Sequence, residues 1–417
     1  MPPSRLDSPE SAVSAASIGP LGSPRVVAVL VLALASMFAA GVALRQPFSV
    51  AQPGYLSQVA AWSPSTPIAD TFTPLAYPLL LAPAFRLGGT NGILAVQAAV
   101  YVGTVAVAFY LLLLLEVSPR IAGLGSLLIL LHPEIFLSVP KIWDVGLSVL
   151  LFLLLVLLCV RVQRVGATPL LCLTLGIVFG VALFARPNYA VLTPAIVYAF
   201  WRAPARLSLV RAVSAGLIAA LTFSLAGIAA HGRPFLPRNG PYNLYAGDNP
   251  YSGQSLLERL NGEPSIDVAF RAAHPDLIPA DPGPDFYFSP TLEGVYTHDA
   301  LSFVLHHPGE QMRLIAIKLF TLFRPDTKAH ALGSVYGLVK AALALPALLF
   351  AIALLAPGRA ALVRVDWMLL AFAAAYIVPF ALTNSDPRFR TPLDALLLLF
   401  TVRLLLRGRR WSRTALI

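Results

Sequence analysis

The chain has 417 residues, of which 57% are hydrophobic and only 12% charged, and its mean hydropathy is +0.75. Soluble chains have about a quarter of their residues charged. The composition therefore excludes a soluble globular enzyme, a disordered chain and a fibrous protein. Its long continuous apolar stretches predict an all-α polytopic membrane protein rather than a barrel of alternating strands. The net charge of +10 does not indicate nucleic-acid binding, because many of the 26 arginines stand singly between apolar stretches, where they mark topology.

Residues 1–25, rich in Ser, Pro and Ala, predict a disordered cytoplasmic tail. Hydropathy then predicts about ten transmembrane helices, seven within 26–230 and three within 333–407, followed by a basic cytoplasmic tail at 408–417. The predicted spans are 26–44, 91–115, 121–139, 142–160, 168–184, 188–201, 209–230, 333–356, 366–383 and 392–407. Arginines gather in alternate connections, so the positive-inside rule predicts that both termini are cytoplasmic. Residues 121–139 and 188–201 are the weak spans, since His132-Pro133-Glu134 interrupts the first and the second is short.

Two connections are predicted to lie outside the cytoplasm, at 45–90 and 231–332. Residues 231–310 hold ten of the twenty acidic residues, together with many Pro, Gly and Tyr. This segment is long enough for a small ordered extracytoplasmic cap. From Pro308 to Phe323 the pattern predicts an amphipathic helix that lies in the membrane interface.

Asp70 and Asp144 are the candidate catalytic carboxylates. Asp70 is the sole acidic residue in the first outer connection, and it is either a general base or a loop residue that caps the next helix. Asp144 precedes a long apolar helix and is either a site residue or a helix cap. The nearby His132 and Glu134 lack the further ligands of a metal site, and Cys159 and Cys172 lie in apolar segments as small buried hydrophobes.

Three arginines fall on the side of the membrane that the positive-inside rule disfavours. They are Arg186, in the break between two apolar helices, and Arg388 and Arg390, in the short connection before the last span. Because a guanidinium forms a planar fork suited to phosphate, a lipid-linked phosphate would account for them. The alternative is internal ion pairing, for instance with Asp386.

The run from Gly240 to Tyr251 is dense in turn formers and polar aromatic residues. Its Tyr and Asn side chains, among them Asn243 and Asn249, are able to stack on and hydrogen-bond a sugar. A purely structural turn is the alternative.

Taken in chain order, these features resemble the GT-C membrane glycosyltransferases, specifically the bacterial relatives of protein O-mannosyltransferases and of the lipid A aminoarabinose transferase. The resemblance covers nearly the whole chain and rests on the order of its pieces. They are Tyr55, the run Pro74-Leu75-Ala76-Tyr77-Pro78, Pro133, Asp144, Arg186-Pro187, the run from Asn243 to Pro250, His307-Pro308 ahead of Lys318, and the run from Arg388 to Leu393.

The resemblance implies transfer of a sugar from a polyprenyl-phosphate donor to a lipid, glycan or protein acceptor at the outer face of the bacterial plasma membrane. It implies no nucleotide sugar and no phosphate-cradling Gly loop. The sequence predicts no cofactor, and a divalent metal is not expected because His132 and Glu134 lack further ligands. Asp70 and Asp144 would act on the acceptor. The implied substrate-binding residues are Arg186, Arg388, Arg390, Lys318, Tyr77, Asn243 and Asn249.

The family usually has an acidic residue three or four positions before the residue that corresponds to Tyr55, where this chain has Gln52 and Ala51. A glutamine cannot act as a general base. Gln52 therefore leaves open a catalytically inactive relative that assembles the cell envelope. A transporter or flippase of a lipid-linked intermediate is the other alternative, because it would use the same outer arginines without chemistry.

Overall fold

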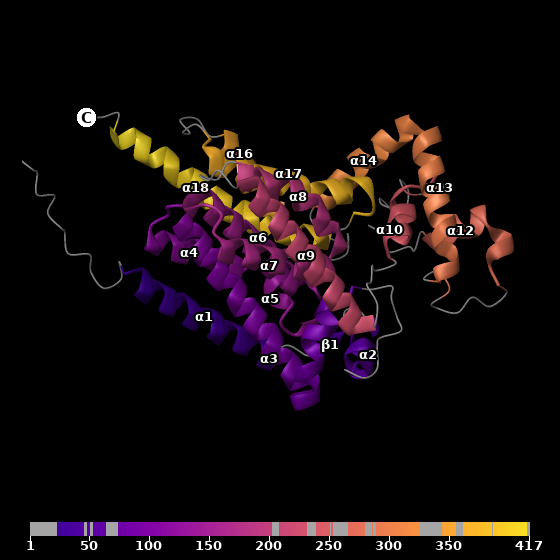
Figure 1. Ribbon diagram of the computed structural model, residues 1–417, viewed down its shortest axis with the longest axis horizontal. Coiled ribbons are helices and arrows are strands. Elements are labelled where there is room, and N and C mark those ends of the chain that lie inside the picture. The colour runs from indigo at the N-terminus through magenta and orange to yellow at the C-terminus, as the bar shows by residue number, and fades with distance from the viewer. Residues whose placement is uncertain are drawn as a thin grey trace, which may run out of the picture.

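The computed structural model is an α-helical membrane protein built around one elongated bundle (Figure 1). It describes residues 23–45, 48–50, 53–63, 74–201, 208–231, 239–250, 252, 266–279, 286, 289–324, 344–355, 362–385 and 387–414. Asp70, Gln52, Ala51 and Asp386 lie outside these residues, as does the side chain of Arg388.

Five helices in the described residues are long and apolar enough to cross a membrane. They are α1 (Pro24–Arg45), α3 (Ala76–Leu114), α6 (Val145–Val165), α9 (Ser208–His231) and α17 (Arg364–Leu382). Shorter helices accompany them: α4 (Pro119–Leu130), α7 (Pro169–Ala185), α8 (Thr193–Trp201) and α16 (Leu345–Leu355), and α18 (Thr391–Thr414) carries an apolar first half before its basic end. Large apolar side chains stay exposed along the outer helices, including Met37, Leu217 and Leu221, as expected for a surface covered by lipid.

The helices differ from the predicted spans in three places. α3 begins at Ala76, well before residue 91, and bends at Gly88 and Gly89, where Gly89 adopts a φ of 56° that favours glycine. The predicted span 121–139 is instead α4 followed by the short helix α5 (Pro133–Leu137), because Pro133 cannot continue a preceding helix. The predicted span 188–201 begins as a 3₁₀ helix, η2 (Pro187–Leu192), before α8.

α7 and α9 approach each other closely along two glycines of α7. A Cβ atom on Gly176 would lie 2.7 Å from the carbonyl oxygen of Ala215, and one on Gly180 would lie 2.6 Å from that of Ala219. Small residues at such positions let two helix backbones pack directly in a membrane, where burial from water provides no driving force.

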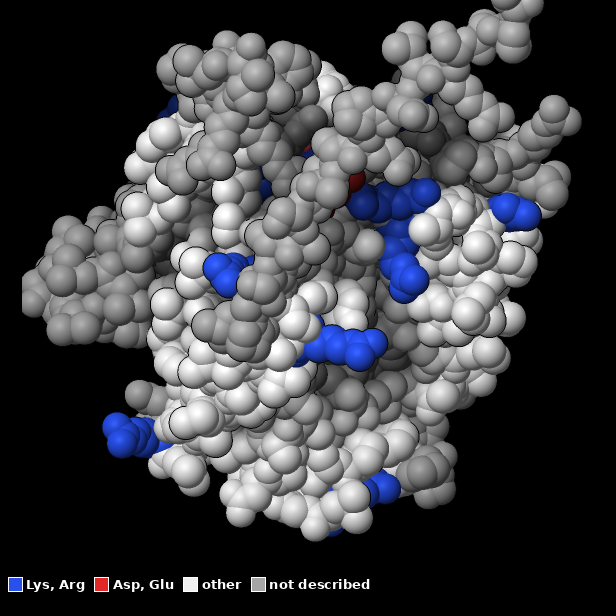
Figure 2. Space-filling model, turned by 90° about the vertical axis from the view of Figure 1, so that its left-hand side faces the viewer, with Lys and Arg blue, Asp and Glu red and all other residues white. Residues whose placement is uncertain are grey.

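One end of the bundle gathers basic helix termini, and we call it the basic end. Arg164 in the last turn of α6 forms a 2.8 Å ion pair with Glu116, which follows α3. Arg403 of α18 pairs at 2.6 Å with Asp366 in the first turn of α17 and also donates to the carbonyl of Leu115. These contacts bring the ends of α3 and α6 and the middle of α18 beside the start of α17. Figure 2 looks at this side of the molecule, where blue Lys and Arg side chains are spread over the surface and little red is visible.

The opposite end carries the two predicted outer connections. The first forms β1 (Ser49–Val50) and α2 (Pro53–Ala61), and β1 pairs in parallel with β2 (Lys141–Ile142), with Ser49 opposite Lys141. The second forms α10 (Asn239–Gly247), α12 (Ile266–Ala273), η3 (Pro275–Leu277), η5 (Pro290–Leu292), α13 (Glu293–His306) and α14 (Pro308–Phe323). α10, α12 and α13 project from the bundle (Figure 1) around a small aromatic core of their own, and Gly247 at the end of α10 packs against the backbone of Thr383.

Candidate functional site

Asp144 and Arg186 form an ion pair at the end of the bundle opposite the basic end. Asp144 precedes α6, and Arg186 is the extended residue between α7 and η2, as expected for a residue before proline. Both Nε and Nη2 of Arg186 lie 2.9 Å from Oδ2 of Asp144. The side chain of Asp144 makes no capping hydrogen bond to α6. Its side-chain partner is the arginine, while its N-cap position still places the carboxylate where the helix dipole favours a negative charge.

The Asp144–Arg186 pair is mostly buried but still reaches the surface. The side chains of Asp144 and Arg186 are 14% and 10% exposed. Within the described residues, no hydrogen bond reaches Oδ1 of Asp144, which leaves one carboxylate oxygen able to accept a proton or a hydroxyl hydrogen bond. A partly exposed carboxylate beside a planar cation is an arrangement able to hold a polar ligand with a negative group.

Aromatic side chains surround the guanidinium of Arg186. The hydroxyl of Tyr189 donates to the carbonyl of Ser148 at 2.8 Å, and that of Tyr376 donates to the carbonyl of Phe389 at 2.9 Å. The ring of Phe389 has its centroid 5.9 Å from the central guanidinium carbon, within the range of a cation–π contact. Phe152 packs against both tyrosines from within the core, at centroid distances of 6.2 and 4.9 Å, so the aromatic rim is held rigidly.

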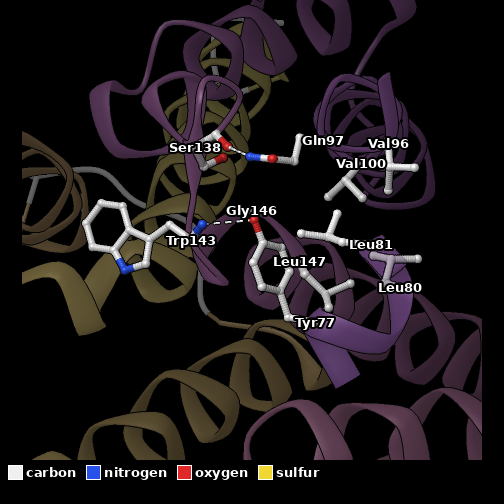
Figure 3. Close-up of a pocket in the computed structure, with 10 residues that line it drawn as sticks. All are labelled: Tyr77, Leu80, Leu81, Val96, Gln97, Val100, Ser138, Trp143, Gly146 and Leu147. Carbon is white, nitrogen blue, oxygen red and sulfur yellow. Dashed lines mark hydrogen bonds between the residues drawn. The ribbon is translucent and has the colours of Figure 1, made fainter. Parts of the chain in front are cut away.

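Tyr77 ties the first outer connection to the segment that carries Asp144. Its hydroxyl accepts a 2.8 Å hydrogen bond from the backbone N–H of Trp143 (Figure 3). Its ring meets that of Tyr55 edge-on at 5.3 Å. The side-chain amide of Gln97 donates to the carbonyls of Ser138 and Lys141 in the same segment. Two neighbouring pieces of the resemblance, Tyr55 and Tyr77, thus fix the backbone next to Asp144.

The cavity beside Tyr77 is too small for a sugar. It is lined on one side by apolar residues of α3 and by Leu147, and its volume of about 10 Å³ suits roughly one water molecule (Figure 3). Tyr77 consequently acts here as a structural link between two segments. A sugar would have to approach Asp144 from its exposed side.

Arg390 occupies a different position from the one that phosphate binding predicts. Its side chain is fully buried, with Nε 3.0 Å from Oδ2 of Asp394 and Nη1 donating at 2.7 Å to the carbonyl of Leu322. Leu322 lies in the last turn of α14, whose final carbonyls have no partner within the helix. The structure therefore shows the internal ion pair that was the alternative for Arg390, with Asp394 as the partner. His132 lies 3.5 Å from the same carboxylate.

Lys318 is also buried rather than presented to a ligand. Its ammonium lies 2.6 Å from Oδ1 of Asp248, and neither side chain is exposed. Burial lowers the pKa of Lys318 and raises the pKa of Asp248, and the attraction between the two charges opposes both shifts. Because Asp248 follows α10, this pair fastens α14 to the predicted cap, which makes Lys318 a positioning residue in this state.

The two asparagines of the Tyr- and Asn-rich run have different surroundings. Asn249 is buried, and its side-chain amide donates to the carbonyl of Tyr245 at 2.6 Å, so the structural-turn alternative describes it. Asn243 lies half-buried in α10. Tyr245 belongs to the aromatic core of the cap, with Tyr296 5.2 Å away.

The structure brings together residues that sequence reasoning did not single out. Tyr189 and Tyr376 flank Arg186, whereas Asp394 and Asp248 neutralise Arg390 and Lys318. The one local signal among these was the four-residue spacing of Arg390 and Asp394, which places the two on one helical face. Within the described residues, no three His, Cys, Asp or Glu side chains come together as a metal site would require.

No protein-family model matches the chain, and no curated protein is significantly similar to it. The functional interpretation depends on the chemistry of its residues.

Proposed function

We propose that this chain is an integral-membrane glycosyltransferase that moves a sugar from a polyprenyl-phosphate donor to an envelope acceptor at the outer face of the bacterial plasma membrane. In this proposal the bundle crosses the membrane ten times, through α1, α3, α4, α6, α7, η2 with α8, α9, α16, α17 and α18. The basic end faces the cytoplasm, because basic residues are retained there. The site around Asp144 and Arg186 then faces outward.

The observation that carries the proposal is the Asp144–Arg186 pair within its aromatic rim. A guanidinium suits a phosphate diester, and a carboxylate suits an acceptor hydroxyl. The guanidinium and the carboxylate are both partly exposed and border the first outer connection, whereas the rings of Tyr189 and Tyr376 are fully buried. A transporter would also use the arginine, but it would have no need of the carboxylate oxygen that stays open beside it.

The reaction would be an inverting displacement at the anomeric carbon. The acceptor oxygen forms a bond to this carbon while the bond from the carbon to the phosphate oxygen breaks, and the electron pair leaves with the phosphate. Arg186 stabilises the departing charge. The hydroxyl proton passes to a carboxylate, for which Asp70 remains the predicted general base and Asp144 orients the acceptor through Oδ1.

Arg390 and Lys318 have altered roles in this proposal. Their buried ion pairs hold η8 (Pro387–Arg390) and the cap against α14, so both residues position the site without touching the donor. Arg388 and Asn243 stay candidate donor contacts. The proposal requires no metal and no nucleotide cofactor.

The experiment compares the envelope glycans and lipids of a deletion strain with those of strains complemented by wild-type chain, Asp70→Asn, Asp144→Asn and Arg186→Gln. Arg164→Gln serves as the matched control, because it breaks an exposed arginine–carboxylate pair at the basic end. We expect one sugar modification to disappear on deletion, to stay absent with the three site variants and to return with the control. Restoration by all three variants would contradict catalysis at this site and favour the inactive relative.

A further inference from the structure

A second cavity, lined by both polar and apolar residues, lies at the basic end, far along the helices from Asp144. It has a volume of about 690 Å³ and lies between the end of α6, the end of α8 and the start of α17. Gln163, Tyr198, Arg364 and Trp367 are among its lining residues. This volume falls within the range of small-molecule sites, about 300–1,000 Å³.

Two polar groups in this cavity lack protein partners. Both the oxygen and the nitrogen of the Gln163 amide are buried without a hydrogen bond. Within the described residues, Arg364 has no hydrogen bond or ion pair and its side chain is exposed. A buried amide without partners costs about 1–3 kcal/mol, so the site is built for a ligand that donates to the oxygen and accepts from the nitrogen.

The carboxylate of Asp366 lies near this cavity but does not repel an anion, because Arg403 neutralises its charge. Asp366 is fully buried, with Oδ1 2.6 Å from Nε of Arg403 and Oδ2 accepting from the backbone N–H of Val363 at 2.9 Å. Among the described residues that line the cavity, the charged side chain is that of Arg364. Its free guanidinium matches a phosphate group.

The surroundings indicate that the phosphate belongs to a lipid. Trp367 is 55% exposed and lies one turn from Arg364 in the first turns of a helix that is long and apolar enough to span a membrane. Tryptophan beside a cation at the end of such a helix is typical of the depth at which phospholipid headgroups lie. Val363, 40% exposed, adds an apolar edge for acyl chains.

We propose that this cavity binds the headgroup of an anionic glycerophospholipid that carries free hydroxyls. Arg364 binds the phosphate, a headgroup hydroxyl donates to the Gln163 oxygen, and the Gln163 nitrogen donates to a phosphate or glycerol oxygen. Trp367 covers the glycerol backbone. The site is separate from the proposed glycosyl-transfer site and does not depend on it.

The test uses the purified full chain in mild detergent and a phosphatidylglycerol analogue with a photoreactive group near its glycerol. Cross-linked peptides are mapped by mass spectrometry. We expect labelling at the end of α6 and the start of α17, with unlabelled phosphatidylglycerol competing at least tenfold better than phosphatidylcholine. Labelling confined to other helices, or equal competition by phosphatidylcholine, would overturn the proposal. Competition by inorganic phosphate at equal concentration would identify free phosphate as the ligand and would also overturn it.

Variants distinguish lipid binding at this defined site from nonspecific attraction to a basic surface. Arg364→Gln should lower labelling about tenfold, the effect of losing one charge-assisted hydrogen bond, and Gln163→Leu should also lower it. Arg161→Gln is the matched control, because Arg161 is exposed on the same end of α6 and does not line the cavity. We expect it to stay within twofold of wild type. Equal losses for Arg364→Gln and Arg161→Gln, in chains with unchanged unfolding midpoints, would show nonspecific attraction and refute the site.

Discussion

Replacing Arg390 with methionine tests whether this buried arginine holds the fold or binds the donor. Methionine keeps much of the side-chain volume but removes the charge that pairs with Asp394 and the N–H group that reaches Leu322. Asp394 is 1% exposed, so its carboxylate would be left buried without its arginine. Removing one partner of a buried ion pair costs about 3–5 kcal/mol. We therefore expect Arg390→Met to lose about 3–5 kcal/mol of stability.

The assay is equilibrium unfolding of the purified variants in detergent, followed by far-ultraviolet circular dichroism as dodecyl sulfate is added. A double variant, Arg390→Met with Asp394→Leu, should recover about half of the loss or more, because it removes both charges together. Arg313→Met is the control, since Arg313 forms an exposed pair with Glu310 and should change stability by less than about 1 kcal/mol. If Arg390→Met unfolds like wild type but abolishes sugar transfer, the buried-pair reasoning is refuted and the guanidinium is available to the donor.

Three further predictions follow from the site, the helix packing and the topology. Arg186→Lys should lower the rate of sugar transfer roughly 10–100-fold in a donor-dependent assay, because an ammonium cannot make the two coplanar hydrogen bonds of a guanidinium. Unchanged turnover would remove Arg186 from the site. Gly180→Val should destabilise the chain by about 1–3 kcal/mol in the unfolding assay, because its Cβ would lie 2.6 Å from the carbonyl oxygen of Ala219. Gly216→Val is the control and should not destabilise the chain, because the space around Gly216 is open. Equal effects of the two variants would contradict the close α7–α9 contact. A cysteine placed at Gly294 should react with an impermeant maleimide in intact cells, and one at Arg161 only after permeabilisation; the reverse pattern would invert the proposed orientation.

The apolar helices could be predicted from sequence because a membrane requires long runs of apolar residues. The fold class and the positions of α1, α6, α9 and α17 followed directly from hydropathy. The start of α3 could not be predicted in this way, since residues 76–90 contain Pro83 and two glycines, which by local propensity interrupt a helix. Tertiary packing of Tyr77 and Leu81 in the core maintains helical structure there despite these residues.

The sequence did not predict which residues form ion pairs with the buried charged side chains. Lys318 and Asp248 are 70 positions apart, and Arg186 and Asp144 are 42 apart. Hydropathy shows that each charge is costly at its depth, but it does not show which opposite charge lies nearby. The phosphate interpretation was applied to Arg186, Arg388 and Arg390, whereas the structure buries Arg390 and leaves Arg186 partly exposed.

The difference in exposure between these two arginines has a consequence for the proposed reaction. A donor phosphate that binds Arg186 must share the guanidinium with Asp144, because both contacts of the arginine go to one carboxylate oxygen. Two anions next to one cation repel each other unless a proton or a hydroxyl lies between them. An acceptor hydroxyl that donates to Asp144 would relieve that repulsion, so donor and acceptor would bind more favourably together than either does alone. The same pair would thereby disfavour a bound donor without its acceptor, which protects the lipid-linked sugar from transfer to water.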